Sequence, residues 1–112
     1  MCKLCRANII ANRPLNQKVI KLIHSIRKKL NPLKIIIFGS ISRGDYHELS
    51  DIDLVIVGNY DLPFFQRIGL IIDLNPTDLE IEPLVYTESE FNRMIERNNV
   101  FITHILEEGI EV

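Results

Sequence analysis

The chain has 112 residues, of which 46% are hydrophobic and 25% charged, and its formal net charge is −2 at pH 7. These values are ordinary for one globular domain, so we expect a single domain over residues 1–112, with residues 1–13 as a flexible N-terminal segment. No apolar run is long enough to cross a bilayer, and no apolar stretch follows Lys3 and Arg6. We therefore expect no membrane span and no signal peptide, and a cytoplasmic location.

Charge is distributed unevenly along the chain. Residues 1–44 contain ten Lys or Arg and no acidic residue, whereas residues 45–112 contain three Arg and all fifteen acidic residues. Such asymmetry can attract a polyanion or an acidic protein surface, or it can simply keep one helix face solvated. It also allows a head-to-tail homo-oligomer without requiring one.

The two cysteines, Cys2 and Cys5, form a lone CxxC pair at the N-terminus. This spacing suits half of a Zn²⁺ site, but a thioredoxin-like redox role would need a strand-to-helix turn. Two free thiols in a frayed end are the simpler interpretation, and the role of the pair stays open.

An apolar stripe at helical spacing predicts the first helix. Asn12 or Asn16 can cap its start, Pro14 suits its first turn, and Asn31-Pro32 ends it. The stripe comprises Leu15, Val19, Leu22, Ile23, Ile26 and Leu30.

Three strands and three more helices follow in chain order. The strands are predicted over residues 34–38, a short β-branched run, over 51–57, which has period two, and over 79–86. An α/β sheet with helices on at least one face is the expected architecture. The helices are predicted over residues 62–74, 88–97 and 100–108, with a Thr87–Glu90 capping box and Gly109 as the final stop.

An Asp-x-Asp pair opens the second predicted strand. Asp51 and Asp53 lie two residues apart, so both side chains point to one face and can bind the same divalent cations. Burying two adjacent carboxylates is costly unless a cation compensates them. The apolar residues around them favour an ion site over a solvated acidic edge.

The first strand runs directly into Gly39-Ser40. Glycine allows close backbone approach, and exposed N–H groups and a serine hydroxyl can receive phosphate oxygens. Arg43, in the connecting segment, can neutralise a phosphate or close an ion pair. The joint order of strand, Gly-Ser, short helix and Asp-x-Asp strand is more specific than any of its parts.

These residues carry a family resemblance. Gly39-Ser40-Ile-Ser-Arg43-Gly44-Asp45 followed by Ser50-Asp51-Ile-Asp53-Leu54 resembles the signature of the minimal nucleotidyltransferase (MNT) family of the DNA polymerase beta superfamily. The likeness extends loosely over most of the chain, and residues 38–57 are its specific part. It implies an α/β (α+β) fold, a mixed β-sheet with helices packed on it, and two-metal nucleotidyl transfer from ATP or another triphosphate.

The resemblance also implies residue roles. Gly39 and Ser40 would bind the triphosphate tail, with Arg43 as a further phosphate contact. Asp51 and Asp53 would ligate two Mg²⁺ ions that stabilise the attacking and leaving oxygens.

A third carboxylate, usually an aspartate, comes from a neighbouring strand in the family. Here that strand contains no aspartate, and we expect Glu82 to be the metal ligand or general base, with Glu80 as the alternative. The histidines receive no role: His24 and His104 have the pattern of packing or surface residues, and nothing fixes the geometry of His47.

Small proteins similar to this one pair with a HEPN-domain RNase toxin, onto a tyrosine of which the MNT antitoxin transfers AMP. The resemblance therefore implies an antitoxin that adenylylates such a partner. Two alternatives stay open: a weakly active or inactive binding module that neutralises its partner by contact, and transfer to RNA or to a small molecule. The acceptor, the base preference and the oligomeric state do not follow from the sequence. Contact with RNA phosphates would use Lys18, Lys21, Lys28 and Lys29.

Overall fold

The computed structural model describes residues 13–39 and 52–112. The expectations for the CxxC pair, for most of the N-terminal segment and for His47 fall outside these residues. The described elements, in chain order, are α2 (Arg13–Leu30), β1 (Lys34–Phe38), β2 (Ile52–Val57), α4 (Phe64–Leu74), β3 (Ile81–Tyr86), α5 (Glu88–Glu96), α6 (Val100–Glu108) and β4 (Ile110–Glu111).

The strands form one mixed sheet in the order β3-β2-β1-β4. β1 pairs antiparallel with β2 and with β4, whereas β2 and β3 are parallel and α4 connects them. The parallel pair requires such a crossover, because strands that run the same way cannot be joined by a tight turn. The predicted mixed sheet with helices packed on it is confirmed.

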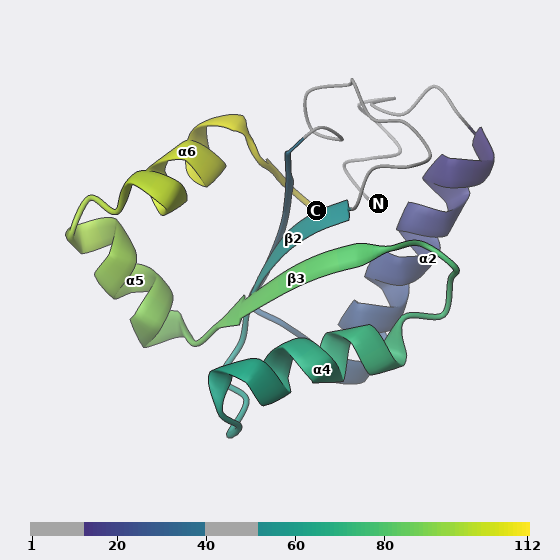
Figure 1. Ribbon diagram of the computed structural model, residues 1–112, viewed down its shortest axis with the longest axis horizontal. Helices are drawn as coiled ribbons and strands as arrows, with labels where there is room; N and C mark the ends of the chain where they lie inside the picture. Colours follow the sequence, from purple (N-terminus) through teal and green to yellow (C-terminus); the bar gives the residue numbers. More distant parts are fainter. Residues whose placement is uncertain (1–12, 40–51) are drawn as a thin grey trace.

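Helices cover both faces of the sheet (Figure 1). α2 and α4 pack on one face, where the core contains Leu22, Ile37 and Leu54. α5 and α6 pack on the other, against Val55 and Val57. The alternation predicted for the second strand is therefore confirmed, because its two apolar sets enter two different cores.

Capping residues in the sequence explain where two of the helices begin or end. Asn31 has φ 46°, and its N–H donates to the carbonyl of Arg27, so this asparagine ends α2 in the left-handed conformation as the Asn-Pro pair predicted. The Thr87–Glu90 capping box is present at α5. Asn16 lies inside α2, which begins at Arg13, so its expected capping role is wrong, and Asn12 lies outside the described residues.

The sequence pattern missed β4. Gly109 ends α6 as expected, but the chain then continues as a two-residue strand on β1, and the N–H of Val112 donates to the carbonyl of Ile35. Glycine is needed there because a Cβ at this position would approach Ile36 Cγ2 at 2.6 Å. A strand of two residues has no periodicity, so only pairing with β1 defines it.

Pro83 fits inside β3 because β3 is an edge strand. The N–H groups of Ile52 and Gly58 donate to the carbonyls of Glu80 and Tyr86, so the even-numbered residues of β3 face β2. The missing N–H of Pro83 therefore lies on the open side of the strand, where no ladder bond is lost.

Arg67 of α4 covers that open edge. This side chain is 7% exposed, and it donates to the carbonyl of Val85 on the outer side of β3. It also donates to the carbonyl of Leu62 and forms an ion pair of 2.7 Å with Glu90, the capping-box residue of α5. One guanidinium thus connects α4, β3 and the start of α5.

No helix among the described residues is both long enough and apolar enough to span a membrane.

Candidate active site

Two carboxylates meet on neighbouring strands. Asp53 of β2 and Glu82 of β3 are direct partners in the parallel register. Asp53 has the same phase as Val55 and Val57, so its side chain lies on the α5/α6 face of the sheet. Parallel strands lie about 4.8 Å apart, which brings two in-register side chains on one face together.

A turn with positive φ lies against Asp53. Gly39, the residue after β1, has φ 80°, a conformation that favours glycine. A Cβ at this position would collide with the Asp53 carboxylate oxygen Oδ2. The turn and the carboxylate are therefore in close contact, as the expected phosphate-binding turn beside a metal-binding acid requires.

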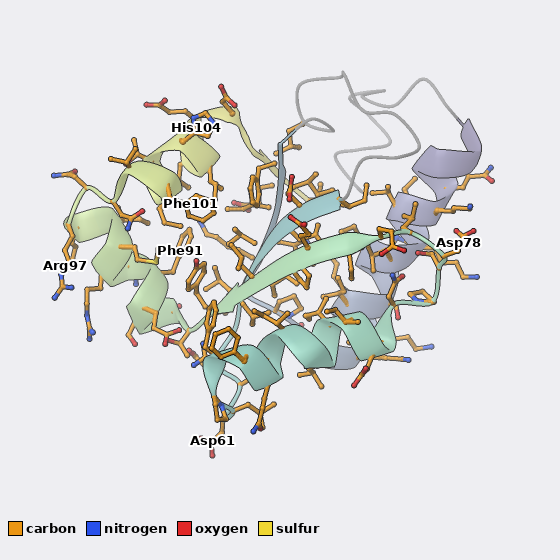
Figure 2. The ribbon with its side chains drawn as sticks, viewed as in Figure 1. Asp61, Asp78, Phe91, Arg97, Phe101 and His104 are labelled. Carbon is orange, nitrogen blue, oxygen red and sulfur yellow. The ribbon has the colours of Figure 1, made fainter. Side chains whose placement is uncertain are left out.

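Both carboxylates line a cavity of about 470 Å³. Its other walls are apolar and come from the ends of β1 and β3, from Ile72 of α4 and from Phe101 of α6. Phe38 and Phe101 meet edge to face, with ring centroids 5.8 Å apart. Figure 2 shows Phe101 projecting from α6 toward the sheet, where it forms one wall of the cavity.

The structure places only part of the predicted site. Gly39, Asp53 and Glu82 come together at one end of the sheet. Glu80 lies just before β3 and does not line the cavity. The remaining predicted residues, Ser40, Arg43 and Asp51, lie outside the described residues.

The two described acids suit a divalent cation. Adjacent carboxylates repel one another unless a cation balances them, and hard oxygen ligands are those that Mg²⁺ prefers. Within residues 13–39 and 52–112, no group of three His, Cys, Asp or Glu side chains gathers as a metal site. The described part of the site thus supplies two of the three carboxylates expected for Mg²⁺.

Sequence reasoning missed the apolar walls of the cavity. Phe38, Ile72 and Phe101 belong to three elements that are far apart in the chain, so no spacing rule connects them. The sequence offered one clue to them: each is an apolar residue beside the buried apolar residues of its own helix or strand. The two helical histidines are surface residues, and His104 contacts Glu108 at 3.1 Å.

We expect Gly39→Ala to lower the free energy of unfolding by about 1–2 kcal/mol, because an L-residue is strained at positive φ. The added Cβ must also displace the Asp53 carboxylate. Urea denaturation of Gly39→Ala, Asp53→Ala and the double variant measures the coupling between the two positions. The cost of Gly39→Ala should be smaller when Asp53 is already alanine, and equal costs in both backgrounds would contradict the contact.

Comparison with known proteins agrees with this geometry. Residues 19–111 match the nucleotidyltransferase domain family. MJ0604 of Methanocaldococcus jannaschii, named as a proposed protein adenylyltransferase, is 43% identical over 81 residues, which cover 68% of this chain and 73% of that protein. MJ0141 of the same organism carries the same designation and is 26% identical over 106 residues, covering 85% of this chain and 99% of its own length.

A solved structure shows the same fold. A protein of Sulfolobus solfataricus, described as a proposed nucleotidyltransferase, superposes with a TM-score of 0.53 and 26% sequence identity, covering 69% of this chain and 70% of that one. Its fold, the family match and the aligned relatives all point to one enzyme class. The chain belongs to the nucleotidyltransferase domain family, as a minimal nucleotidyltransferase, and is a nucleotidyltransferase enzyme.

Proposed function

We propose that this enzyme transfers AMP from ATP to a hydroxyl group of another protein in a reaction that depends on Mg²⁺. The observation that carries the proposal is the juxtaposition of Asp53 and Glu82, in register on one face, with the Gly39 turn against Asp53. Phosphate-binding backbone and metal-binding acids must lie this close for both to act on one triphosphate.

The reaction is an in-line displacement. The acceptor oxygen forms a bond to the α-phosphorus of ATP, the bond from that phosphorus to the bridging oxygen breaks, and pyrophosphate leaves. The acceptor hydroxyl loses its proton, for which Glu82 is the base that we propose. Its exposed carboxylate borders the cavity, so an incoming hydroxyl can reach it.

The turn and the acids have different roles in the proposal. Gly39 lets the backbone approach the triphosphate closely, and Ser40 and Arg43 add phosphate contacts in the proposal. Asp53, together with Asp51 and Glu82, would hold Mg²⁺, and two bound ions would supply charge neutralisation at the attacking and leaving oxygens. Asp53 is half-buried on a central strand, so its carboxylate is held in place as a ligand must be.

The names of MJ0604 and MJ0141 support a protein as acceptor. In the proposal the acceptor is a tyrosine of a HEPN-domain RNase toxin, and this chain is its antitoxin, acting as one nucleotidyltransferase domain. A tyrosine suits the cavity, because an apolar ring matches walls such as Phe38 and Phe101 and its hydroxyl matches the two carboxylates.

Label transfer from α-³²P-ATP tests this proposal. The purified enzyme is incubated with Mg²⁺ and either the product of the neighbouring reading frame or an RNA oligonucleotide. Label on a tyrosine of the protein, and its loss with EDTA, is the expected result. Label on RNA instead would identify an RNA acceptor. Protection of cells by the chain without any label transfer would favour neutralisation by contact.

We expect Glu82→Gln to lower the transfer rate by about tenfold or more, whereas Glu80→Gln leaves it within about twofold. The substitutions remove the same charge two residues apart, but only Glu82 pairs with Asp53 and lines the cavity. Initial rates at saturating ATP measure the difference. A larger loss in Glu80→Gln than in Glu82→Gln would assign the third carboxylate to Glu80.

A further inference from the structure

One face of α4 is apolar and exposed. Phe65 is 82% exposed and Ile72 is 50% exposed, although the opposite side of the same helix contributes Arg67 and Ile71 to the interior. Phe65, Ile68, Gly69 and Ile72 follow one another at helical spacing, and we call them the α4 stripe. Contiguous exposed apolar surface of this kind marks interaction sites in proteins.

Gly69 lies within this continuous helix, where the described contacts do not require a glycine. A Cβ at Gly69 would meet no atom within 4 Å, and its φ is not positive. Glycine within a helix is destabilising compared with alanine, and the described packing around Gly69 leaves room for a larger side chain. A small residue between two exposed apolar ones lets the backbone of another molecule approach closely.

The α4 stripe continues into the reaction cavity. Ile68 and Ile72 belong to the stripe and also line the cavity that holds Asp53 and Glu82. Phe101, 40% exposed, forms part of the wall on α6. A molecule bound on the stripe therefore lies beside the carboxylates, because the stripe and the carboxylates border the same cavity.

Acidic side chains flank the stripe within its own segment of the chain, and one exposed base, Arg93 of α5, lines a hollow with Phe64 at the start of α4. Between residues 59 and 82 the basic side chain is that of Arg67, which is buried in its ion pair with Glu90. Asp61, at the tip of the loop before α4, and Asp73 are both exposed (Figure 2 labels Asp61). The complementary surface is apolar at its centre and rimmed by Lys or Arg.

We propose that the α4 stripe is the surface on which the acceptor protein docks through an apolar patch with a basic rim, which places its hydroxyl at the carboxylate pair. This inference rests on the proposed function, because it names where the acceptor of that reaction binds. In the proposed function the Gly39 turn, which contacts Asp53, binds the nucleotide, so docking on the stripe and ATP binding use different residues.

Gly69→Arg gives the sharpest test. Arginine forms helix nearly as well as alanine, and the space around Gly69 is open, so the variant should unfold at a temperature no lower than wild type. Its bulk and positive charge should nevertheless block a basic-rimmed partner. With the product of the neighbouring reading frame as probe, we expect KM for the acceptor to rise about tenfold or more, and KM for ATP to stay within about twofold.

Phe65→Ser should raise the acceptor KM in the same way, and Leu33→Ser is the matched control. Leu33 is 56% exposed, but it precedes β1 at the end of the sheet away from Gly39. Calorimetric binding of the same probe to Asp53→Asn, with and without Gly69→Arg, separates docking from catalysis. If Gly69→Arg abolishes binding of the probe, and the wild-type enzyme transfers no label to it, the result would support docking and refute the transferase proposal.

Three results would overturn the inference. Equal acceptor KM and equal binding for wild type and Gly69→Arg would show that the stripe is not used. A rise in KM for ATP would assign the stripe to the nucleotide. Dissociation of a wild-type dimer by Gly69→Arg in sedimentation, with acceptor KM unchanged, would make the stripe a contact between two copies of this chain.

Discussion

Asp53→Asn is expected to lower the rate of nucleotidyl transfer by about 10²-fold or more while the protein remains folded. Asparagine keeps the shape of the side chain and removes the charge that would balance Mg²⁺ in the proposed mechanism, and metal ions contribute several kcal/mol of transition-state stabilisation. The loss should be in kcat/KM for ATP, because in the proposed mechanism the triphosphate and the metal bind together beside the Gly39 turn, which contacts Asp53. Initial rates over a range of ATP concentrations, with circular dichroism to verify the fold, measure it.

Glu107→Gln is the control for this substitution. It removes the same charge from an exposed position on α6, and it should leave the rate within about twofold. Titration with Mg²⁺ adds a second readout, since Asp53→Asn should need a higher concentration for half-maximal rate. Full activity of Asp53→Asn at the same Mg²⁺ requirement would remove the basis of the catalytic proposal.

Arg67→Ala should lower the free energy of unfolding by about 3 kcal/mol. The change leaves the carbonyls of Leu62 and Val85 without their donor and leaves Glu90 without its cation. Urea denaturation followed by circular dichroism measures the change. Arg97→Ala is the matched control, because Arg97 is exposed and projects away from the molecule (Figure 2).

The same ion pair gives stability a dependence on pH. The hydrogen bond from Arg67, followed by the N–H of Thr87, lowers the pKa of Glu90 below its ordinary value of 4.5. A depressed folded-state pKa stabilises the protein above the unfolded value, and this contribution is lost as pH falls through the folded value. The difference in unfolding free energy between wild type and Glu90→Gln should therefore have its full value above pH 4.5. It should shrink as the pH falls below that value through the lowered pKa of folded Glu90. A difference that does not change with pH would contradict the ion pair.

Local patterns in the sequence predicted most of the fold. The predicted first and last residues of β1 agree with the structure, and the predicted ends of the helices of the C-terminal half lie within two residues of the observed ends. These elements, and the end of α2, have strong local causes: a β-branched run before Gly39, a capping box at Thr87, and Asn31 before a proline. β4 lacked such a cause and was missed, because hydrogen bonds to β1 define it.

The sequence by itself determined which residue types occur at the candidate site, and residue type and period two are enough to predict a phosphate-binding turn followed by acids on one face of a strand. It favoured Glu82 but kept Glu80 as an alternative, because both residues have the same phase along the strand. The parallel register of β2 and β3 places Glu82, and not Glu80, beside Asp53.

Only the tertiary structure decided what surrounds those acids. Arg67 occurs in an apolar helix and has no sequence motif, yet it is buried because α4 packs over the edge of β3. The cavity walls likewise unite residues from separate helices and strands. Local sequence dictates phase and conformation over a few residues, whereas contacts between distant segments depend on how strands pair and helices pack.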